Sequence, residues 1–373
     1  MIYFDNAATS RYKPRAVKRA VTRSLRHSAN PGRGSHDEAI RSAEIVEKTR
    51  EALARHVSAK RANVIFTKNC TEALNLAILG TARPGGHVVT TALEHNSVLR
   101  PLRMLQKEGL ISLTIVDPKN GALSAESIRQ AMCDKTYLVA ITAMSNVTGY
   151  CPPLEKIGEL CAVEGVKLLV DGAQALGHKR IDFDGIGIDL LCGAGHKSLH
   201  GIMGTGFLIY GKHTFVNPLM YGGTGTEGAN PYQPTNPPES LESGTLNLPG
   251  IAALKEGILW TERHYKKNGM RIAELSLFLH QKLGEYGIET FSVKGSPLVT
   301  FRVKGYDSAT LADLLNEKYG IALRAGLHCA PLVHRSLGTE NEGLLRVSIG
   351  GENTMREARK LLVALRNLTQ STK

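Results

Sequence analysis

The sequence predicts an α/β fold in which a mostly parallel sheet is covered by helices on both faces. Strand-like apolar runs alternate with helical patterns between residues 60 and 210, and such alternation is typical of parallel sheets. A stretch rich in proline and glycine at 217–250 interrupts this alternation, and a second, shorter set of strands and helices follows it. We therefore predict a large domain over residues 1–250, which includes the N-terminal segment, and a small C-terminal α/β domain over residues 251–373.

In chain order, the first predicted element is an amphipathic helix at 37–57, where apolar side chains recur at helical spacing. The strands of the large unit are predicted at 64–67, 88–91, 113–116, 138–141, 168–170 and 206–210. The helices between them are predicted at 71–80, 97–108, 124–132 and 154–164. Residues 217–250 predict a long functional loop, and a helical region at about 250–285 follows. The small unit has predicted strands at 298–303 and 345–349, with helices at about 308–319 and 353–368.

The composition is that of a soluble globular protein, with 42% hydrophobic and 21% charged residues in a chain of 373. No apolar run approaches the roughly 20 residues of a membrane span, and the N-terminus has no apolar stretch typical of a secretory signal. The six cysteines form no C-x-x-C pair, which favours reduced thiols. We therefore expect a cytoplasmic protein that does not bind membranes, and we expect no metal site.

The net charge of +12 is concentrated in part near the N-terminus, where no acidic residue lies between Asp5 and Asp37. This stretch carries eight basic residues: Arg11, Lys13, Arg15, Lys18, Arg19, Arg23, Arg26 and Arg33. Such a pattern occurs in organelle transit peptides and in nucleic-acid patches. The sequence has no recognised nucleic-acid module, and the residues before the stretch look like part of the mature fold. We therefore interpret it as a solvated basic helix face, oriented toward anionic metabolites or an acidic partner protein, and expect no nucleic-acid binding.

Two segments suggest the chemistry of pyridoxal phosphate (PLP). The apolar run 167–170 ends in Asp171, as a buried strand would present a carboxylate at its tip, and Lys197 stands among small residues 26 positions later. PLP needs a lysine amine that holds its aldehyde as a Schiff base, and a carboxylate that keeps the ring nitrogen protonated. Taken singly, Asp171 is better interpreted as a loop cap and Lys197 as a solvated surface lysine; only the two together favour a PLP site. The segment around Lys197 also resembles a phosphate-binding loop, but His196 separates the glycine from the lysine, so we set that interpretation aside.

These two segments belong to a longer series of motifs that run in one order along the chain. The series comprises Y-F-D-N-A-A-T at 3–9, N-P-G-R-G-S-H at 30–36, T-K-N-C-T-E-A-L-N at 67–75, L-E-H-N-S at 93–97, S-N-V-T-G at 145–149, V-D-G-A-Q at 170–174, G-H-K at 195–197, E-S-G-T at 242–245, R-A-G-L-H-C-A at 324–330 and L-R-V-S-I-G at 345–350. Together they resemble fold-type-I PLP enzymes of the class V aminotransferase group, and within it the branch of cysteine desulfurases and selenocysteine lyases. The resemblance implies a large PLP-binding domain with a mostly parallel seven-stranded sheet.

The resemblance also implies roles for individual residues around the cofactor. Lys197 would form the Schiff base, Asp171 would pair with the ring nitrogen, and His95 would stack on the ring and act as acid or base. The phenolic oxygen would be bound by Gln174 and flanked by Asn146. The phosphate would be bound by Cys70, Thr71 and His196, with Gly244 and Thr245 of the other subunit, which implies a homodimer. Ala194 stands where the family usually has serine, and losing one hydrogen bond to a charged phosphate costs about 1.5–3 kcal/mol. This departure predicts weaker retention of PLP.

Cys329 separates activities within the family, because desulfurases use a thiolate to take up sulfur whereas aminotransferases need none. Free cysteines are often inert and buried, but Cys329 falls in a predicted loop near the positive charge of Arg324. A buried arginine in a strand needs a partner, so Arg346 predicts a site for the substrate carboxylate, with Arg324 as a second candidate and Asn146 beside them. Leu327 stands where the family often has histidine, which leaves open the choice between sulfur and selenium.

The resulting expectation is a PLP-dependent cysteine desulfurase that converts L-cysteine to L-alanine and carries the sulfur as a persulfide on Cys329. One alternative is a selenocysteine lyase or another class V lyase or aminotransferase. Another is a non-enzymatic sulfur-carrier or scaffold protein that uses Cys329 without PLP. The expected partners are L-cysteine or a close analogue, a second copy of the chain and a sulfur-acceptor protein.

Overall fold

The computed structural model describes residues 1–31, 34–60, 62–119 and 121–370, with the side chains of 369 and 370 outside the description. Its largest element is a seven-stranded sheet with the strand order β2-β8-β7-β6-β5-β3-β4. The strands are β2 (Ala62–Thr67), β3 (Gly86–Thr91), β4 (Ile111–Val116), β5 (Thr136–Thr142), β6 (Lys167–Asp171), β7 (Leu190–Ala194) and β8 (Gly206–Gly211). β8 runs antiparallel to both of its neighbours, while β3 to β7 form parallel pairs. The mostly parallel sheet predicted from the sequence is therefore confirmed, and β7 is a strand that the sequence prediction did not include.

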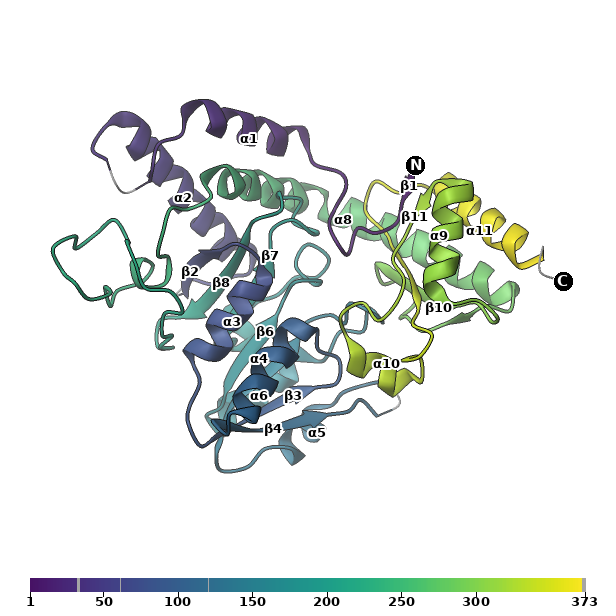
Figure 1. Cartoon of the computed structure of the whole chain (residues 1–373), viewed down its shortest axis with the longest axis horizontal. Coiled ribbons are helices and arrows are strands. Elements are labelled where there is room, and N and C mark those ends of the chain that lie inside the picture. The colour runs from purple at the N-terminus through teal and green to yellow at the C-terminus, as the bar shows by residue number, and fades with distance from the viewer. Residues whose placement is uncertain (32–33, 61, 120, 371–373) are drawn as a thin grey trace.

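Helices cover both faces of this sheet (Figure 1). The helices of the large unit are α1 (Arg15–His27), α2 (Asp37–His56), α3 (Cys70–Gly80), α4 (Asn96–Lys107), α5 (Ala125–Gln130), α6 (Leu154–Glu164) and the short α7 (Phe183–Ile186). Side chains of successive strand residues point to opposite faces, so Ile65 and Leu138 pack with α3 and α4, while Phe66 and Val139 pack with α2 and α6. The sheet is thus buried on both sides, as its continuous apolar strands predict.

One long helix links this sheet to the smaller unit. α8 (Leu248–Glu285) packs its first half in the core of the large sheet and its second half in the core of the small unit, and Figure 1 shows it passing from one to the other. The small unit contains a three-stranded antiparallel sheet of β9 (Glu289–Thr290), β10 (Leu298–Arg302) and β12 (Leu345–Ser348). Its helices are α9 (Ser308–Tyr319) and α11 (Met355–Gln370), whereas α10 (Pro331–Leu337) packs Val333 in the core of the large sheet.

The first residues of the chain pair with the small unit. β1 (Ile2–Tyr3) forms a parallel pair with β11 (Ile321–Ala322), and Phe4 is buried in the core that α8, α9 and α11 share. The chain then enters α1, which buries Val17 and Ser24 and leaves its basic side chains exposed. The exposed ones are Arg15, Lys18, Arg19, Arg23 and Arg26, whereas Arg33 and part of the motif at 30–36 lie outside the described residues.

The predicted long loop at 217–250 has little regular structure, apart from the 3-10 turn Glu239–Leu241 and the first residues of α8. Its end is fixed to the large unit by a buried ion pair between Arg50 and Glu242, with Nη2 and Oε2 2.6 Å apart. All six cysteines are free. Among the described residues, none of the helices combines the length and the apolar composition that a membrane span requires.

Candidate active site

A cavity of about 190 Å³ lies at the carboxyl ends of β5, β6 and β7, where open α/β sheets commonly bind ligands. The strands end there with Thr142, Asp171 and Ala194. Eight of the residues predicted for the site line this cavity: Cys70, Thr71, His95, Asn146, Asp171, Gln174, His196 and Lys197. The structure therefore brings together, around one space, side chains that are spread over more than 120 positions of the chain.

Lys197 follows β7 and reaches this cavity from a half-buried position. Burial lowers the pKa of the Lys197 ammonium, and the positive charges of Arg346 and Arg324 act in the same direction, while Asp171 opposes them. A lysine with a lowered pKa supplies a neutral amine more readily, which is what a Schiff-base nucleophile requires. The environment of Lys197 therefore suits a reactive lysine.

Asp171 is the last residue of β6, and its side chain is buried. Its Oδ1 accepts a hydrogen bond from the backbone nitrogen of Ala173 at 2.9 Å, and the Sγ of Cys70 donates to the same oxygen at 3.7 Å. Burial raises the pKa of the Cys70 thiol well above its usual value, and the charge of Asp171 adds to the effect. Cys70 is thus a neutral donor beside a carboxylate that faces the cavity.

His95 caps the N-terminus of α4 and is held in one orientation. Its Nδ1 accepts from the backbone nitrogen of Ser97 at 3.1 Å and lies 2.9 Å from the Ser97 hydroxyl. Burial lowers the pKa of His95 to about 4, so the ring is neutral and carries its proton on Nε2 when Nδ1 accepts. The Ser97 hydroxyl also contacts the Thr71 hydroxyl at 2.8 Å, which joins the first turns of α3 and α4.

The start of α3 provides a place for an anion at one side of the cavity. Asn69 caps this helix by accepting from the backbone nitrogen of Glu72, and Cys70 and Thr71 form its first turn. Glycine is needed at Gly206, because a Cβ there would lie 2.3 Å from the carbonyl carbon of Asn69. The Nδ1 of His196 is buried and has no partner among the described residues. The first turn of a helix next to this buried ring nitrogen fits the phosphate of the expected cofactor.

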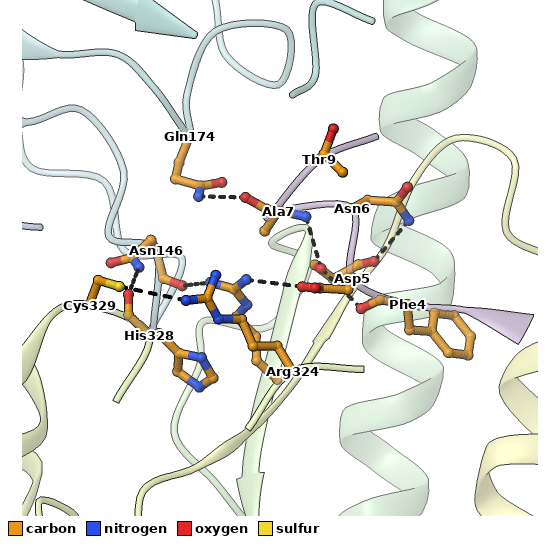
Figure 2. Close-up of polar contacts among 12 residues, drawn as sticks. Phe4, Asp5, Asn6, Ala7, Thr9, Asn146, Gln174, Arg324, His328 and Cys329 are labelled. Atoms are coloured by element: carbon orange, nitrogen blue, oxygen red, sulfur yellow. Dashed lines mark hydrogen bonds and ion pairs between the residues drawn. The ribbon is translucent and has the colours of Figure 1, made fainter. Parts of the chain in front are cut away.

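The N-terminal segment forms part of the same site. Gln174 donates from Nε2 to the carbonyl of Ala7 at 3.1 Å (Figure 2). The carbonyl oxygen of His196, directly before Lys197, accepts from the backbone nitrogen and hydroxyl of Ser10 and from the Lys13 ammonium at 3.0–3.1 Å. Ser10 and Lys13 therefore hold the peptide that joins His196 to Lys197.

Arg346 is fully buried in β12, and two nitrogens of its guanidinium have polar partners. Nη1 donates to the carbonyl of Asn146 at 2.9 Å, and Nη2 pairs with Oδ1 of Asp5 at 3.2 Å. Its Nε has no partner among the described residues. Burial lowers the pKa of Arg346 to about 10, although Asp5 counteracts this effect, so the group remains positively charged at neutral pH. Arg346 is a fixed positive charge close to Asn146 of the cavity.

The segment that carries Cys329 is conformationally unusual, and it exposes Cys329 between the buried residues His328 and Ala330. His328 and Cys329 have φ angles of 50° and 59°, in the left-handed region that residues other than glycine seldom adopt. Two hydrogen bonds fix the segment: Asn146 donates from Nδ2 to the His328 carbonyl at 2.6 Å, and the backbone nitrogen of Asn96 donates to the Cys329 carbonyl at 2.7 Å. The Sγ of Cys329 lies 3.6 Å from Nη2 of Arg324 (Figure 2). An exposed thiol is thus held beside a guanidinium.

Five predicted site residues do not line the cavity of Lys197: Arg324, Cys329 and Arg346, which lie in the small unit, and Gly244 and Thr245. Thr245 lines a separate cavity of about 120 Å³ and Gly244 one of about 130 Å³ near Arg50 and Glu242. The prediction that they contact the phosphate across a dimer stays a prediction. Leu327 is partly exposed at the surface, next to the buried His328.

Several residues of the site were not assigned roles from the sequence. Asp5 and Ala7 lie within the quoted motif at 3–9, and Glu94 and Ser97 lie within the motif at 93–97. The motifs include these positions but do not show their partners. Asp5 contacts Arg346 and Ala7 contacts Gln174. Glu94 contacts Thr142 and Ser97 contacts Thr71, so each contact joins segments that are distant in the sequence.

Comparisons with known proteins show the family and the fold of the chain. Residues 2–361 match the model of the family described as aminotransferase class-V. A probable cysteine desulfurase from Pseudomonas aeruginosa is 34% identical, over 98% of this chain and 93% of the relative. One from Methanothermobacter thermautotrophicus is 32% identical, over 96% and 92%. A solved structure, the apo form of a cysteine desulfurase from Thermococcus onnurineus, superposes with a TM-score of 0.93 at 30% identity, over 99% of this chain and 95% of that one.

Proposed function

The chain belongs to the class-V aminotransferase family, and we propose that it is a PLP-dependent cysteine desulfurase that releases L-alanine from L-cysteine. The observation that carries the finer assignment is Cys329, an exposed thiol fixed by Asn96 and Asn146 with its Sγ 3.6 Å from a guanidinium nitrogen of Arg324. An aminotransferase has no use for such a thiol, whereas a desulfurase needs a nucleophilic thiolate. The names of the similar proteins support the same assignment.

Residues in and around the cavity would bind each part of the cofactor. Lys197 would hold its aldehyde carbon through Nζ, and the Asp171 carboxylate would hold the proton of the ring nitrogen. The first turn of α3 and the unpartnered His196 Nδ1 would bind the phosphate. When bound there, PLP supplies an electron sink for charge that develops on the substrate α-carbon.

The protein side chains then perform the remaining steps. Arg346 binds the substrate carboxylate, because its guanidinium is buried and charged and its Nε has no partner among the described residues. The Lys197 amine moves the α-proton, and its lowered pKa suits a base. The neutral His95 ring covers the site and can donate from Nε2. Arg324 contacts the Sγ of Cys329, which attacks the substrate sulfur as a thiolate.

Sulfur transfer needs no external oxidant or reductant. The bond between the substrate β-carbon and sulfur breaks, and a bond forms between that sulfur and Sγ of Cys329. The β-carbon receives a proton, so that L-cysteine and the enzyme thiol become L-alanine and an enzyme persulfide. We also propose that the enzyme is a homodimer that passes this sulfur to an acceptor protein. The position of Gly244 and Thr245 outside the cavity of their own chain supports the first part.

The test is an absorbance spectrum of the purified protein with PLP, followed by assays of alanine and sulfide. We expect a yellow protein that forms alanine from L-cysteine, with sulfide released only when a reductant is present. Faster alanine formation from L-selenocysteine or cysteine sulfinate, with no persulfide on Cys329, would assign the chain to another lyase of this family. A colourless protein that binds no PLP would favour a sulfur carrier instead.

A further inference from the structure

Glu94 is a fully buried acid in the turn that connects β3 to α4, directly before His95. Its Oε1 accepts two hydrogen bonds, from the Thr91 hydroxyl at 2.6 Å and from the backbone nitrogen of Thr142 at 3.0 Å. Its Oε2 is buried and has no partner among the described residues. A buried carboxyl with one oxygen unpaired is costly, so its retention needs an explanation.

The two hydrogen bonds of Glu94 connect the end of β3, before the turn of His95, to the end of β5, beside Asp171. Thr142 ends β5, lines the cavity and is the register partner of Asp171 in the sheet. The next residue, Ala143, donates its backbone nitrogen to the carbonyl of Asp171 at 2.9 Å. Glu94 therefore precedes His95 directly in the chain and is hydrogen-bonded to Thr142, which pairs with Asp171 in the sheet.

The protonation of Glu94 is tied to this placement. Burial raises the pKa of Glu94 to about 8, and the charge of Asp171 adds to the rise, while the bonds from Thr91 and Thr142 oppose it. The carboxyl is thus neutral at pH 7 and can accept both bonds without placing a second negative charge near Asp171. Once ionised, it would be a buried anion facing another carboxylate, which is unfavourable.

We infer that Glu94 is a positioning residue of the cofactor site, whose carboxyl locks the turn of His95 to the strand end that presents Asp171. The inference rests on the proposed function, because it concerns the same cofactor. Glu94 touches neither the cavity nor the reacting atoms and acts through its two neighbours. Its loss should change how PLP is held, and therefore the optical signal of bound PLP, and not only the stability of the fold.

The test compares Glu94→Gln and Glu94→Ala with the wild type and with Thr90→Val. Thr90→Val is a matched control, because it removes one buried hydrogen bond from β3 to the Ala140 carbonyl without touching the turn of His95. The readouts are the dissociation constant for PLP, the visible circular dichroism of bound PLP and the pH dependence of both. Glutamine keeps an acceptor oxygen for Thr91 and Thr142 and cannot ionise, so Glu94→Gln should bind PLP as the wild type does at pH 7.

Glu94→Ala should bind PLP about tenfold more weakly, because two buried donors lose their acceptor, and its dichroism should be reduced. The wild type should lose affinity as the pH rises through about 8, and Glu94→Gln should not show this loss. Equal PLP binding and dichroism in Glu94→Ala, Thr90→Val and wild type would overturn the inference. So would identical pH dependence in Glu94→Gln and wild type, a comparison that stands even if Glu94→Ala does not fold. Failure of the wild type to bind PLP would instead reject the proposed function.

Discussion

Arg324 points its guanidinium at the sulfur of Cys329, with Nη2 and Sγ 3.6 Å apart. The two residues are close in sequence, but the left-handed backbone at His328 and Cys329 is what brings the thiol to the arginine. Arg324 also exchanges backbone hydrogen bonds with Arg346, so the thiol and the proposed site for the substrate carboxylate share one rigid support.

Replacing Arg324 by glutamine should slow the alkylation of Cys329 by iodoacetamide about threefold to tenfold at pH 7, because a nearby positive charge favours the reactive thiolate. The rate is measured by mass spectrometry of the peptide that contains Cys329, in protein without substrate. Arg335→Gln is the control, since Arg335 is an exposed arginine of α10 that pairs with Glu340. Equal alkylation rates in all three proteins would remove Arg324 from the proposed activation of the thiol.

Cys329→Ala should retain the spectrum of bound PLP but lose the formation of alanine from L-cysteine, because no thiolate remains to accept sulfur. The control is Cys133→Ala, which removes the other exposed thiol and should be fully active. Mass spectrometry of the wild type after L-cysteine should locate one persulfide on Cys329. If Cys329→Ala makes alanine from L-cysteine at the wild-type rate, the desulfurase mechanism is wrong and a β-elimination or selenocysteine activity takes its place.

Lys197→Ala should abolish covalent attachment of PLP, because the other residues that line the cavity carry no amine. Borohydride reduction followed by peptide mapping checks this, with Lys212→Ala as a control on an exposed lysine. The wild type and Lys212→Ala should carry the reduced label on Lys197, and Lys197→Ala should carry none. A label recovered on another lysine would contradict the assignment.

The cofactor-free protein should lose stability as the pH falls from about 6.5 to 4. Burial lowers the pKa values of His95, His178, His196 and His200 to about 4, below the value of about 6.5 in an unfolded chain. Groups with a lowered folded-state pKa stabilise the fold above their unfolded pKa, and this stabilisation is lost as the pH falls toward the folded-state value. In that window each histidine adds up to about 1.4 kcal/mol per pH unit to the slope of the unfolding free energy against pH.

Urea unfolding at pH 7 and pH 5 measures this slope. His178→Gln should reduce it, because a buried titrating ring is replaced by a side chain that does not titrate. His27→Gln, at an exposed position of α1, should leave it unchanged. A wild-type free energy of unfolding that is equal at the two pH values would contradict the prediction.

The sequence predicted most of the large sheet, because its strands are apolar runs that alternate with amphipathic helices. β7 was not predicted, since Leu190–Ala194 has only two large aliphatic residues before cysteine, glycine and alanine. Such a short run is recognised as a strand only when its neighbours β6 and β8 are in place. The pairing of β1 with β11 could not be predicted either, because two residues carry no periodic pattern.

The sequence predicted the residues that line the cavity more completely than the contacts that hold these residues in place. Asp171 and Lys197 could be found because a strand end and a small-residue segment have local patterns. The partner of Arg346 could not be assigned, since Asp5 lies 341 positions away. Glu94 stood in a quoted motif, but its burial and its bond to Thr142 exist only once β5 lies beside β3. The positive φ angles at His328 and Cys329 could not be predicted, because neither residue is a glycine.

The attachment of the N-terminal segment to the C-terminal unit determines when the site is finished during synthesis. Ile2 pairs with Ile321, and the backbone nitrogen of Ala7 donates to the hydroxyl of Ser348. Ile2 and Ala7 therefore obtain these partners only after synthesis has passed Ile321 and Ser348. Closing so long a loop is slow compared with local folding, so the large sheet can form well before Ile2 and Ala7 reach these partners. A nascent or shortened chain that stops before Ile321 lacks both partners, so the segment whose Ala7 carbonyl accepts from Gln174 has no anchor in the small unit.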